Sequence, residues 1–543
     1  MRGRGRGPVH GRGRGSRRRG ARTGPGRVAC VLLPALLTLL AAACTADGRS
    51  GGGPSGAPGA ATPGEIVIAS GRDVTGKGGI RQQLIDAWNE RQEERRTGWT
   101  ARLVELPGAA DQQRSQLLGA LQSGSAEYDV VNLDVTWVPE FAAAGVIRPL
   151  AKELLDRDMI DAVARTGRWK DDVVAVPFNS DVGLLYYRKD YLAKAGVKDP
   201  DLGGTVRTWD RLRSLVRTVD TADGLPDSYT KGWTTQLAPY EGRTVNAVEA
   251  FASVGAGGLV DAEGRYASDP DRIEDGLGEL KDRTDGAYTL ADATSSYEAD
   301  TLDDFEAGRT AFLRHWPYAY RTLHQALPAS RLGVAPLPGK AVLGGQNLAV
   351  SSDSPRAGAA ADLIRFLTDK VSERCLLDAG FAATRRSAYT DANIECGARA
   401  PRSHPDPSTR VGTGTRAGTG TRADAGKDDD AGRGAGKGGG GSPGAARGER
   451  TSRMPLDGDG RPAYAARTLL PALEHAVQRP RTPLYGAFTG TFAARLGPLF
   501  GDGSEEPGSA AAGGSSACRR PATDAALAVC LDRALREALP PGG

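Results

Sequence analysis

The chain has 543 residues, of which 39% are hydrophobic and 25% are charged, a composition ordinary for a globular protein large enough to bury two cores. The formal net charge is +4, but much of the excess arginine lies in the first 27 residues, so the rest of the chain is close to neutral. We therefore expect no nucleic acid or other acidic partner, and the five histidines are too few to favour a histidine-based metal site.

The N-terminal region is typical of a targeting segment. A basic stretch that ends at Arg27 is followed by an apolar run over residues 28–43, which is too short to span a bilayer comfortably. This run ends in Ala41-Ala42-Ala43-Cys44, which resembles a bacterial lipobox with Ala41 where Leu is usual. We expect residues 1–44 to be a signal peptide with lipid attached to Cys44, so that the product is exported and anchored to the outer face of the cell membrane. Cleavage after the alanines without lipidation is the alternative, and the export route stays open between general secretion and the twin-arginine pathway.

Three tracts rich in glycine and alanine stand apart from the rest of the chain. Residues 45–64 are typical of a flexible tether, and residues 502–516 have a similar composition. Residues 397–453 repeat Gly-Thr, Gly-Ala and Arg-Ala units, which cannot bury enough apolar surface to offset the entropy of ordering the chain. We predict that residues 397–453 form a disordered insertion.

Beyond residue 64 the apolar pattern alternates between strand-like and helix-like segments. Residues 66–69 predict a strand, residues 80–88 a helix, residues 101–106 a second strand and residues 116–121 a second helix. Residues 128–133 predict a buried strand that leads into a polar and aromatic loop. Strands that alternate with helices indicate a largely parallel sheet, in which ligands bind at the carboxyl ends of the strands.

Later segments continue the pattern with a mostly helical region over residues 208–314. Strands are predicted at 173–178, 183–187, 310–314 and 343–351, and helices at 189–195, 357–367, 464–476 and 523–539.

The cysteines outside the signal region fit an exported protein. There are four of them, an even number, which in an oxidising compartment predicts two disulfides. Sequence order favours Cys375 with Cys396 and Cys518 with Cys530. The chain has no Cys-x-x-Cys spacing that would indicate zinc, and we predict no cofactor.

Short motifs in a fixed order resemble the extracellular solute-binding proteins of family 1, which include the maltose- and trehalose-binding proteins of ABC importers. Two departures are Gln346, where many sugar binders of this family carry Trp, and the insertion after Gly397. The motifs that carry the resemblance are residues 128–134 with Trp137 and 141–150, residues 176–187, residues 308–316, residues 333–338, residues 344–350, residues 360–368, residues 380–389 and residues 479–485.

The resemblance implies an α/β fold of the periplasmic-binding-protein type, with two discontinuous lobes, a hinge and a central ligand cleft. We expect lobe 1 to comprise residues 65–176 and 345–372, and lobe 2 residues 177–344, 373–396 and 454–543. It also implies a monomer that closes on a solute, with a di- or oligosaccharide as the expected class, and passes it to ABC permease subunits without any chemistry.

Candidate ligand contacts lie at predicted loops and strand ends, where planar polar groups can meet sugar hydroxyls and aromatic rings can meet the CH faces of a sugar. For several of them a structural role is the alternative: Asp134 as a helix cap, Trp137 and Trp316 as core residues, and Asn179 and Asp181 as turn residues. The predicted site residues are Arg72, Asp73, Asp134, Trp137, Asn179, Asp181, Trp316, Gln346, Asn347 and Arg385.

Two other functions remain open from the sequence. A sensory or partner-anchoring binding lipoprotein would also close on its ligand, so the sequence does not separate it from a transport component. A secreted glycosidase would need a pair of carboxylates, which the many acidic residues could supply. Outside the glycine-rich tracts the chain has no Gly-x-Ser-x-Gly motif. It has no His-Glu-x-x-His motif, and we do not expect an enzyme.

Overall fold

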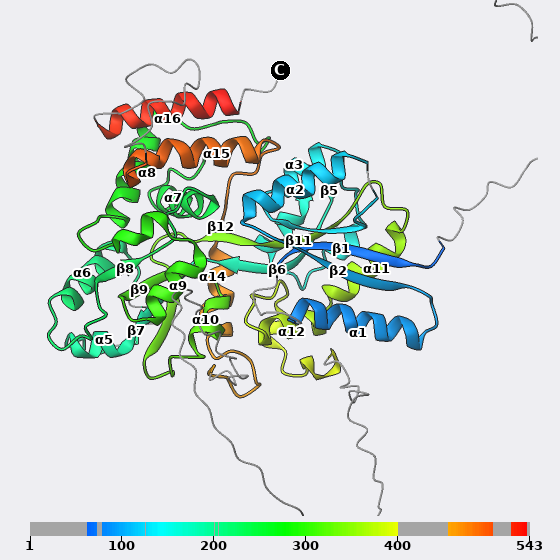
Figure 1. Cartoon of the computed structure of the whole chain (residues 1–543), viewed down its shortest axis with the longest axis horizontal. Coiled ribbons are helices and arrows are strands. Elements are labelled where there is room, and N and C mark those ends of the chain that lie inside the picture. Colours follow the sequence, from blue (N-terminus) through cyan, green and yellow to red (C-terminus); the bar gives the residue numbers. More distant parts are fainter. Residues whose placement is uncertain are drawn as a thin grey trace, which may run out of the picture. The chain divides into compact units, whose positions relative to one another are not determined.

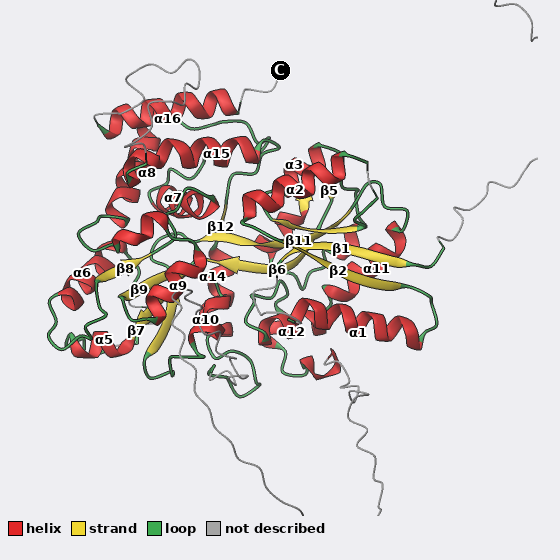
Figure 2. Ribbon diagram, in the orientation of Figure 1, coloured by secondary structure: helices red, strands yellow, loops and turns green. Residues whose placement is uncertain are grey.

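The computed structural model describes residues 62–72, 79–124, 126–199, 201–202, 204, 206–399, 454–502 and 523–539. These residues form an α/β structure with two larger β-sheets and helices packed around each of them (Figures 1 and 2). We call the sheet that contains β1 the first sheet and the sheet that contains β7 the second sheet.

The first sheet has the strand order β12-β11-β3-β1-β2, and β6 also pairs with β11. Strands β1, β2 and β3, which are the first three in the chain, are parallel, as the alternation of strands and helices predicted, because α1 and α2 connect them. By contrast, β11 runs antiparallel to both β3 and β6. The elements are β1 (Glu65–Gly71), α1 (Ile80–Glu94), β2 (Thr100–Leu106), α2 (Ala110–Gln122), β3 (Val130–Asp134), β6 (Val176–Val182), β11 (Val342–Val350) and β12 (Val477–Gln478).

The second sheet has the order β10-β7-β9-β8, in which only β8 and β9 are parallel. Apolar side chains of β7 and β9 pack against α5 and α6. Tyr187 of β7 and Phe312 of β9 share one hydrophobic core with Trp209 of α6. The elements are β7 (Leu184–Arg188), α5 (Lys189–Lys194), α6 (Trp209–Asp220), β8 (Lys231–Thr234), α9 (Glu298–Glu306), β9 (Thr310–His315), α10 (Tyr318–Leu323) and β10 (Leu332–Pro336).

Four helices that are distant in sequence pack together beside the second sheet (Figure 1). Phe251 of α7 meets Phe492 of α15 edge to face, with 5.5 Å between the ring centroids. Asp269 caps α8 by accepting a hydrogen bond from the backbone N–H of Arg272, and Thr523 caps α16 in the same way. The four helices are α7 (Glu241–Ser253), α8 (Pro270–Arg283), α15 (Tyr485–Leu496) and α16 (Asp524–Ala538).

Short elements complete the described chain. They are α3 (Val138–Ala143), α4 (Asp161–Ala164), β4 (Arg168–Trp169), β5 (Asp172–Val173), α11 (Ala357–Leu367), α12 (Lys370–Asp378), α13 (Ser387–Thr390) and α14 (Leu470–His475), which follows a π-helical turn at Ala465–Leu469.

The segment 373–396, which we expected to belong wholly to lobe 2, is divided between the two cores. Cys375 and Phe381 pack with β1 and α1, whereas Ala382 and Tyr389 pack with strands of the second sheet. The division begins within α12, where Cys375 and Leu376 pack in the first of these cores and Leu377 packs in the second, because successive residues of a helix point to different sides. Strand β12, which we also placed in lobe 2, pairs with the first sheet.

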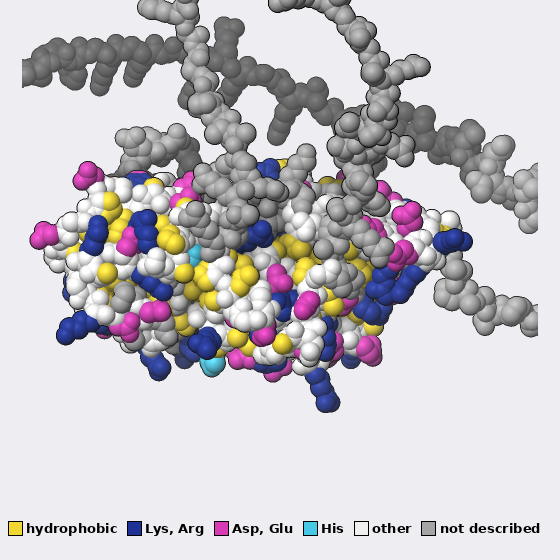
Figure 3. Space-filling view, turned by 90° about the horizontal axis from the view of Figure 1, so that it is seen from below, with side chains coloured by type: hydrophobic (Ala, Val, Ile, Leu, Met, Phe, Trp, Pro, Cys, Tyr) yellow, Lys and Arg dark blue, Asp and Glu magenta, His cyan; other side chains and the backbone are white. Residues whose placement is uncertain are grey.

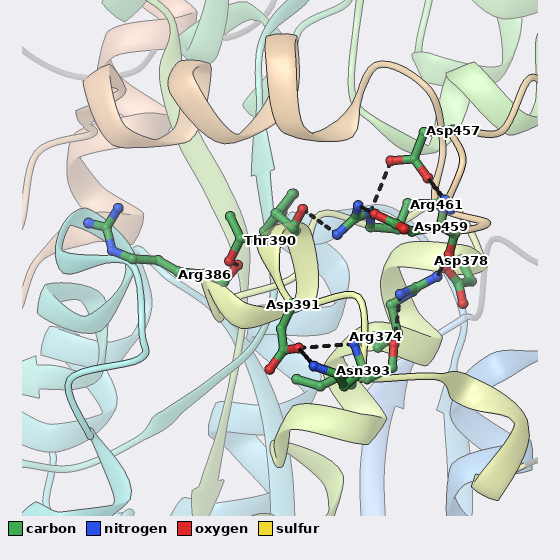
Figure 4. Close-up of polar contacts among 11 residues, drawn as sticks. Arg374, Asp378, Arg386, Thr390, Asp391, Asn393, Asp457, Asp459 and Arg461 are labelled. Atoms are coloured by element: carbon green, nitrogen blue, oxygen red, sulfur yellow. Dashed lines mark hydrogen bonds and ion pairs between the residues drawn. The ribbon is translucent and has the colours of Figure 1, made fainter.

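Polar contacts join the two stretches of chain that precede and follow residues 400–453 (Figure 4). Arg374 of α12 donates to the carbonyls of Ile394 and Asp459, at 2.7 and 2.8 Å. Arg461 donates to the carbonyl of Tyr389 at 2.8 Å. The described ends on either side of the tract are thereby fixed against the same helix.

The predicted disulfide between Cys375 and Cys396 is present. Cys530 is also disulfide-bonded, while its predicted partner Cys518 lies outside the described residues, as do Cys44, the signal region and most of the tether.

No helix in the described ranges is both long enough and apolar enough to cross a membrane. Figure 3 shows basic and acidic side chains interspersed over the described part of one face, rather than gathered by sign.

Candidate functional site

Polar side chains form a row across three neighbouring strands of the first sheet. In the centre, Gln346 of β11 lies opposite Asp134 of β3 on one side and opposite Asn179 of β6 on the other. Gly344 lies opposite Asp181, two residues further along both strands. Since residues opposite one another and residues two apart share a face of a sheet, Asp134, Asn179, Asp181 and Gln346 lie on the same face.

Arg81 binds this row from the first turn of α1, where it is buried. Its Nη2 donates to Oε1 of Gln346 at 2.6 Å and to Oδ1 of Asn179 at 3.3 Å, and its Nη1 donates to Oγ of Ser70 at 3.0 Å. Asn132 also donates to Oε1 of Gln346, at 2.9 Å. These contacts fix the orientation of the Gln346 amide.

Asp134 is the first member of a buried ionic chain. Both of its carboxylate oxygens accept from Nη2 of Arg479, at 2.9 and 3.1 Å, and Nη1 of Arg479 donates to Glu241 at 2.6 Å. Burial raises the pKa of Glu241, and the nearby Arg479 partly offsets that rise. Because Arg479 follows β12 and Glu241 begins α7, the chain of charges connects the first sheet to the helices beside the second sheet.

Asp181 has no comparable partner. Its Oδ1 is buried without a hydrogen bond, and the ion pairs found among the described residues do not include it. Burial raises the pKa of Asp181 to about 7, although the positive charge of Arg81 acts against the rise. Asp181 is thus the acceptor in this row that lacks a donor.

Trp316 follows β9 and lies, like Asp181, against Gly344. A Cβ placed on Gly344 would be 3.1 Å from Cβ of Asp181 and 3.3 Å from the Trp316 ring, so a larger residue there would require one of the two to shift. The guanidinium of Arg314 stacks over the ring at 3.8 Å from its centroid, and Arg314 is held by Glu249 at 2.7 Å. Trp316 itself is half-buried.

Trp137, Asn347 and Arg385, which were predicted as site residues, lie away from this row. Trp137 is buried in a hydrophobic core. Asn347 is fully buried and exchanges hydrogen bonds with Thr166, because it follows Gln346 and so points to the other face of β11. Arg385 is occupied by a bidentate ion pair with Asp156, both contacts being 2.7 Å. Arg72 is exposed after β1, and Asp73 lies outside the described residues.

Sequence reasoning did not select Arg81, Asn132 or Arg479 as site residues. Arg81 offered a signal, because it lies between apolar residues on what became the buried side of α1. Arg479 falls within one of the motifs of the resemblance, but nothing in its neighbours indicated a partner more than three hundred positions earlier, at Asp134.

The chemistry of the row is that of hydrogen bonding. It offers carboxylate and amide acceptors, guanidinium and amide donors, and one aromatic ring. Within the described ranges, no three or more His, Cys, Asp or Glu side chains are grouped so as to hold a metal ion.

Comparisons with known proteins agree with this architecture. A relative from Deinococcus radiodurans, described as a probable ABC transporter-binding protein, is 29% identical over 321 residues, which is 57% of this chain and 73% of the relative. A maltose-bound MalE3 of T. maritima shares the fold with a TM-score of 0.60 and 22% identity, covering 87% of this chain and 99% of that one.

The cyclic alpha-maltosyl-1,6-maltose binding protein from Arthrobacter globiformis matches with a TM-score of 0.58 and 18% identity, over 89% of this chain and 100% of that one. These two structures show the two-lobe fold. Residues 83–401, more than half of the chain, match the family model described as bacterial extracellular solute-binding protein. The chain therefore belongs to the family of bacterial extracellular solute-binding proteins.

Proposed function

We propose that this protein is the solute-binding component of an ABC import system and that it takes a di- or oligosaccharide at the row of Asp134, Asn179, Asp181 and Gln346. The family membership and the ABC transporter-binding description of the Deinococcus relative support the transport role. The sugars in the descriptions of the two structural neighbours support the solute class. The protein acts outside the cytoplasm, held to the membrane by lipid on Cys44, and performs no reaction on its solute.

The observation that carries the proposal is the pairing of an unsatisfied carboxylate with an aromatic ring. Oδ1 of Asp181 is buried and has no donor, and Trp316 lies against the same glycine. A sugar brings hydroxyl donors for the carboxylate and a CH face for the indole. Leaving such a carboxylate oxygen unsatisfied is costly, so a ligand that satisfies it gains affinity.

The remaining groups of the row are already held in place. Arg81 fixes the amides of Gln346 and Asn179, and Arg479 fixes Asp134. Groups that are ordered before the ligand arrives lose little conformational entropy when it binds. The row is therefore suited to recognising one arrangement of hydroxyls.

A thermal-shift screen of the mature chain tests the proposal. Mono-, di- and oligosaccharides form the panel, with amino acids as the comparison class. We expect the melting temperature to rise with one class of sugar, because a ligand that binds only the folded state stabilises it. Loss of uptake of that sugar on deletion of the gene would support the transport role. A rise with amino acids and none with sugars would overturn the sugar assignment.

Replacing Trp316 with alanine tests the site. We expect the affinity for the sugar found in the screen to fall by about 1–3 kcal/mol, the usual loss when a central aromatic contact is truncated. Isothermal titration calorimetry measures the change. Trp99→Ala is the matched control, since Trp99 is also half-buried but lines a groove between α1 and α11. Equal affinity in the Trp316→Ala and Trp99→Ala variants would remove Trp316 from the site.

A further inference from the structure

A small cavity lies within the second lobe, between the second sheet and α6, α7 and α8. About 10 Å³ of it is open to a water-sized sphere, which is room for a single atom-sized guest. The cavity is lined by Trp209, Trp233, Thr235, Asn246, Glu249, Leu280, Arg283, Thr284 and Arg314.

Buried donors in this lining lack acceptors. Arg283 is 4% exposed, and its Nε donates to Glu279 at 2.8 Å, but both of its terminal nitrogens are buried without a hydrogen bond. The indole nitrogens of Trp209 and Trp233 are also buried without a hydrogen bond, and these residues are 7% and 2% exposed. Buried donors are normally satisfied by protein or by a bound group, so a cluster of unsatisfied ones points to a guest.

The carboxylate and amide acceptors of the lining are already engaged. Oε1 of Glu249 accepts from Nη2 of Arg314 at 2.7 Å and from the backbone N–H of Val342 at 3.1 Å, and Oε2 accepts from Nε of Arg314 at 3.1 Å. Oδ1 of Asn246 accepts from the hydroxyl of Thr235 at 2.6 Å. A guest in this cavity therefore meets free N–H donors, whereas the carboxylate and the amide oxygen are occupied.

Both arginines of the lining are ion-paired, Arg314 with Glu249 at 2.7 Å and Arg283 with Glu279 at 2.8 Å. Arg283 uses only its Nε for that pair, so the two terminal nitrogens of this cation remain without an acceptor. Burial lowers the pKa of Arg283, and the positive charge of Arg213 lowers it further, whereas Glu279 and Glu249 act in the opposite direction. The face of the Arg283 guanidinium is covered by the Trp209 ring, at 4.2 Å from the centroid, so water cannot solvate it from that side.

We propose that this cavity binds one small monovalent anion, a halide such as chloride, between the guanidinium of Arg283 and the indole N–H groups of Trp209 and Trp233. A water molecule would leave some of these N–H groups without an acceptor, because it has to place its own two hydrogens as well, whereas a halide accepts only. The ion would tie α6, α8 and β8 together through Trp209, Arg283 and Trp233.

Crystals of the full chain soaked in sodium bromide test the proposal directly. We expect an anomalous bromide peak in the cavity of the parent protein and of Arg272→Met, an exposed arginine on the same helix. The peak should be absent in Arg283→Met. A water molecule in place of bromide in the parent protein would overturn the proposal, and so would an unchanged bromide peak in a folded Arg283→Met variant.

The dependence of the melting temperature on chloride gives a second readout, measured at constant ionic strength with gluconate as the replacement. We expect a saturable rise of about 2 °C with chloride in the parent protein. Trp209→Phe removes only one donor and keeps the ring, so it serves if Arg283→Met fails to fold, and it should shift the midpoint of the rise to higher chloride. A melting temperature that is the same in both salts would contradict the proposal.

Discussion

Asp134 and Asp181 lie on the same face of one sheet, yet their surroundings give them different properties. Arg479 holds Asp134 with two short contacts, whereas Asp181 is buried near positive charges that do not reach it. Burial without a partner disfavours the charged form, so Asp181 titrates near neutral pH.

We predict that solute affinity depends on pH through Asp181. If the carboxylate accepts sugar hydroxyls, the ligand binds the ionised form, and the free protein must first lose a proton below its pKa of about 7. Affinity should therefore rise by about tenfold from pH 6 to a plateau above pH 8, with proton release on binding at pH 6. Calorimetry in buffers of different ionisation enthalpy measures both effects.

Asp181→Asn is the control for this prediction. Asparagine cannot ionise, so the solute affinity of the variant should be weaker than that of the parent protein at pH 8 and should not change between pH 6 and pH 8. In the unliganded parent the raised pKa means that the folded state holds the proton more tightly than the unfolded one, so Asp181 lowers stability as pH rises from about 4 to about 7. A pH profile that is identical in the variant would show that another group titrates.

The candidate residues were predictable to the extent that strand alternation and strand ends locate them. Asp134, Asn179, Asp181 and Gln346 share one face as those rules require, and the same alternation turns Asn347 to the other face of β11. Arg81 and Arg479 were not predictable, since their roles depend on partners that only tertiary structure brings near, at Gln346 and Asp134.

At the scale of elements, α12 and the turn at Cys396–Arg399 show how a short segment is held without a large core. The disulfide joins the helix to the turn, and Arg374 joins the same helix to residues beyond the long tract (Figure 4). The cross-link closes a loop of 21 residues, which restricts the unfolded chain more than the folded one.

Replacing Cys375 with serine should lower stability by about 3 kcal/mol, the entropy expected from opening a loop of this length. Differential scanning calorimetry measures the loss. Solute affinity should be unchanged, because neither cysteine contacts the row. Cys396→Ser should behave in the same way, and the double variant should lose no more than either single one. Additive losses would show that the two side chains stabilise the fold independently of their bond.

Most regular elements could be predicted because their apolar periodicity is strong, as in α11, whose bounds match the prediction, and in β9. Strand β12 could not be predicted, because a strand of two residues is too short to show an apolar alternation. Its pairing with β11 comes from the tertiary fold. The predicted helix over residues 464–476 is present, but it opens with a π-helical turn that no sequence pattern indicated.

At the scale of the whole molecule, Arg479 connects the two lobes through Asp134 and Glu241. Lobe closure in such a fold is a rotation about the connecting strands, so an ionic link on one side of them influences the closed state. The two-lobe architecture followed from the order of the motifs, whereas the contribution of α12 to two hydrophobic cores did not.

Replacing Arg479 with methionine should destabilise the protein by about 3–5 kcal/mol, since Asp134 and Glu241 would be left buried without their cation. It should also weaken solute binding and increase the radius of gyration of the liganded protein in small-angle X-ray scattering. Arg265→Met, which breaks an exposed ion pair with Asp261, is the control and should change stability by less than about 1 kcal/mol. If the liganded Arg479→Met variant has the same radius of gyration as the liganded parent protein, the ionic link stabilises the fold but does not influence lobe closure.

The position of β11 in the first sheet has a consequence for how the protein is made. This strand lies between β3 and β6, but the whole second sheet precedes it in the chain. While the chain is being synthesised, β1, β2 and β3 can pair, but β3 keeps an open edge until residue 350 has emerged from the ribosome. From residue 134 to residue 350 the nascent chain thus carries an unfinished sheet, and a chaperone that shields this edge can act on the strand that ends at Asp134 throughout that interval.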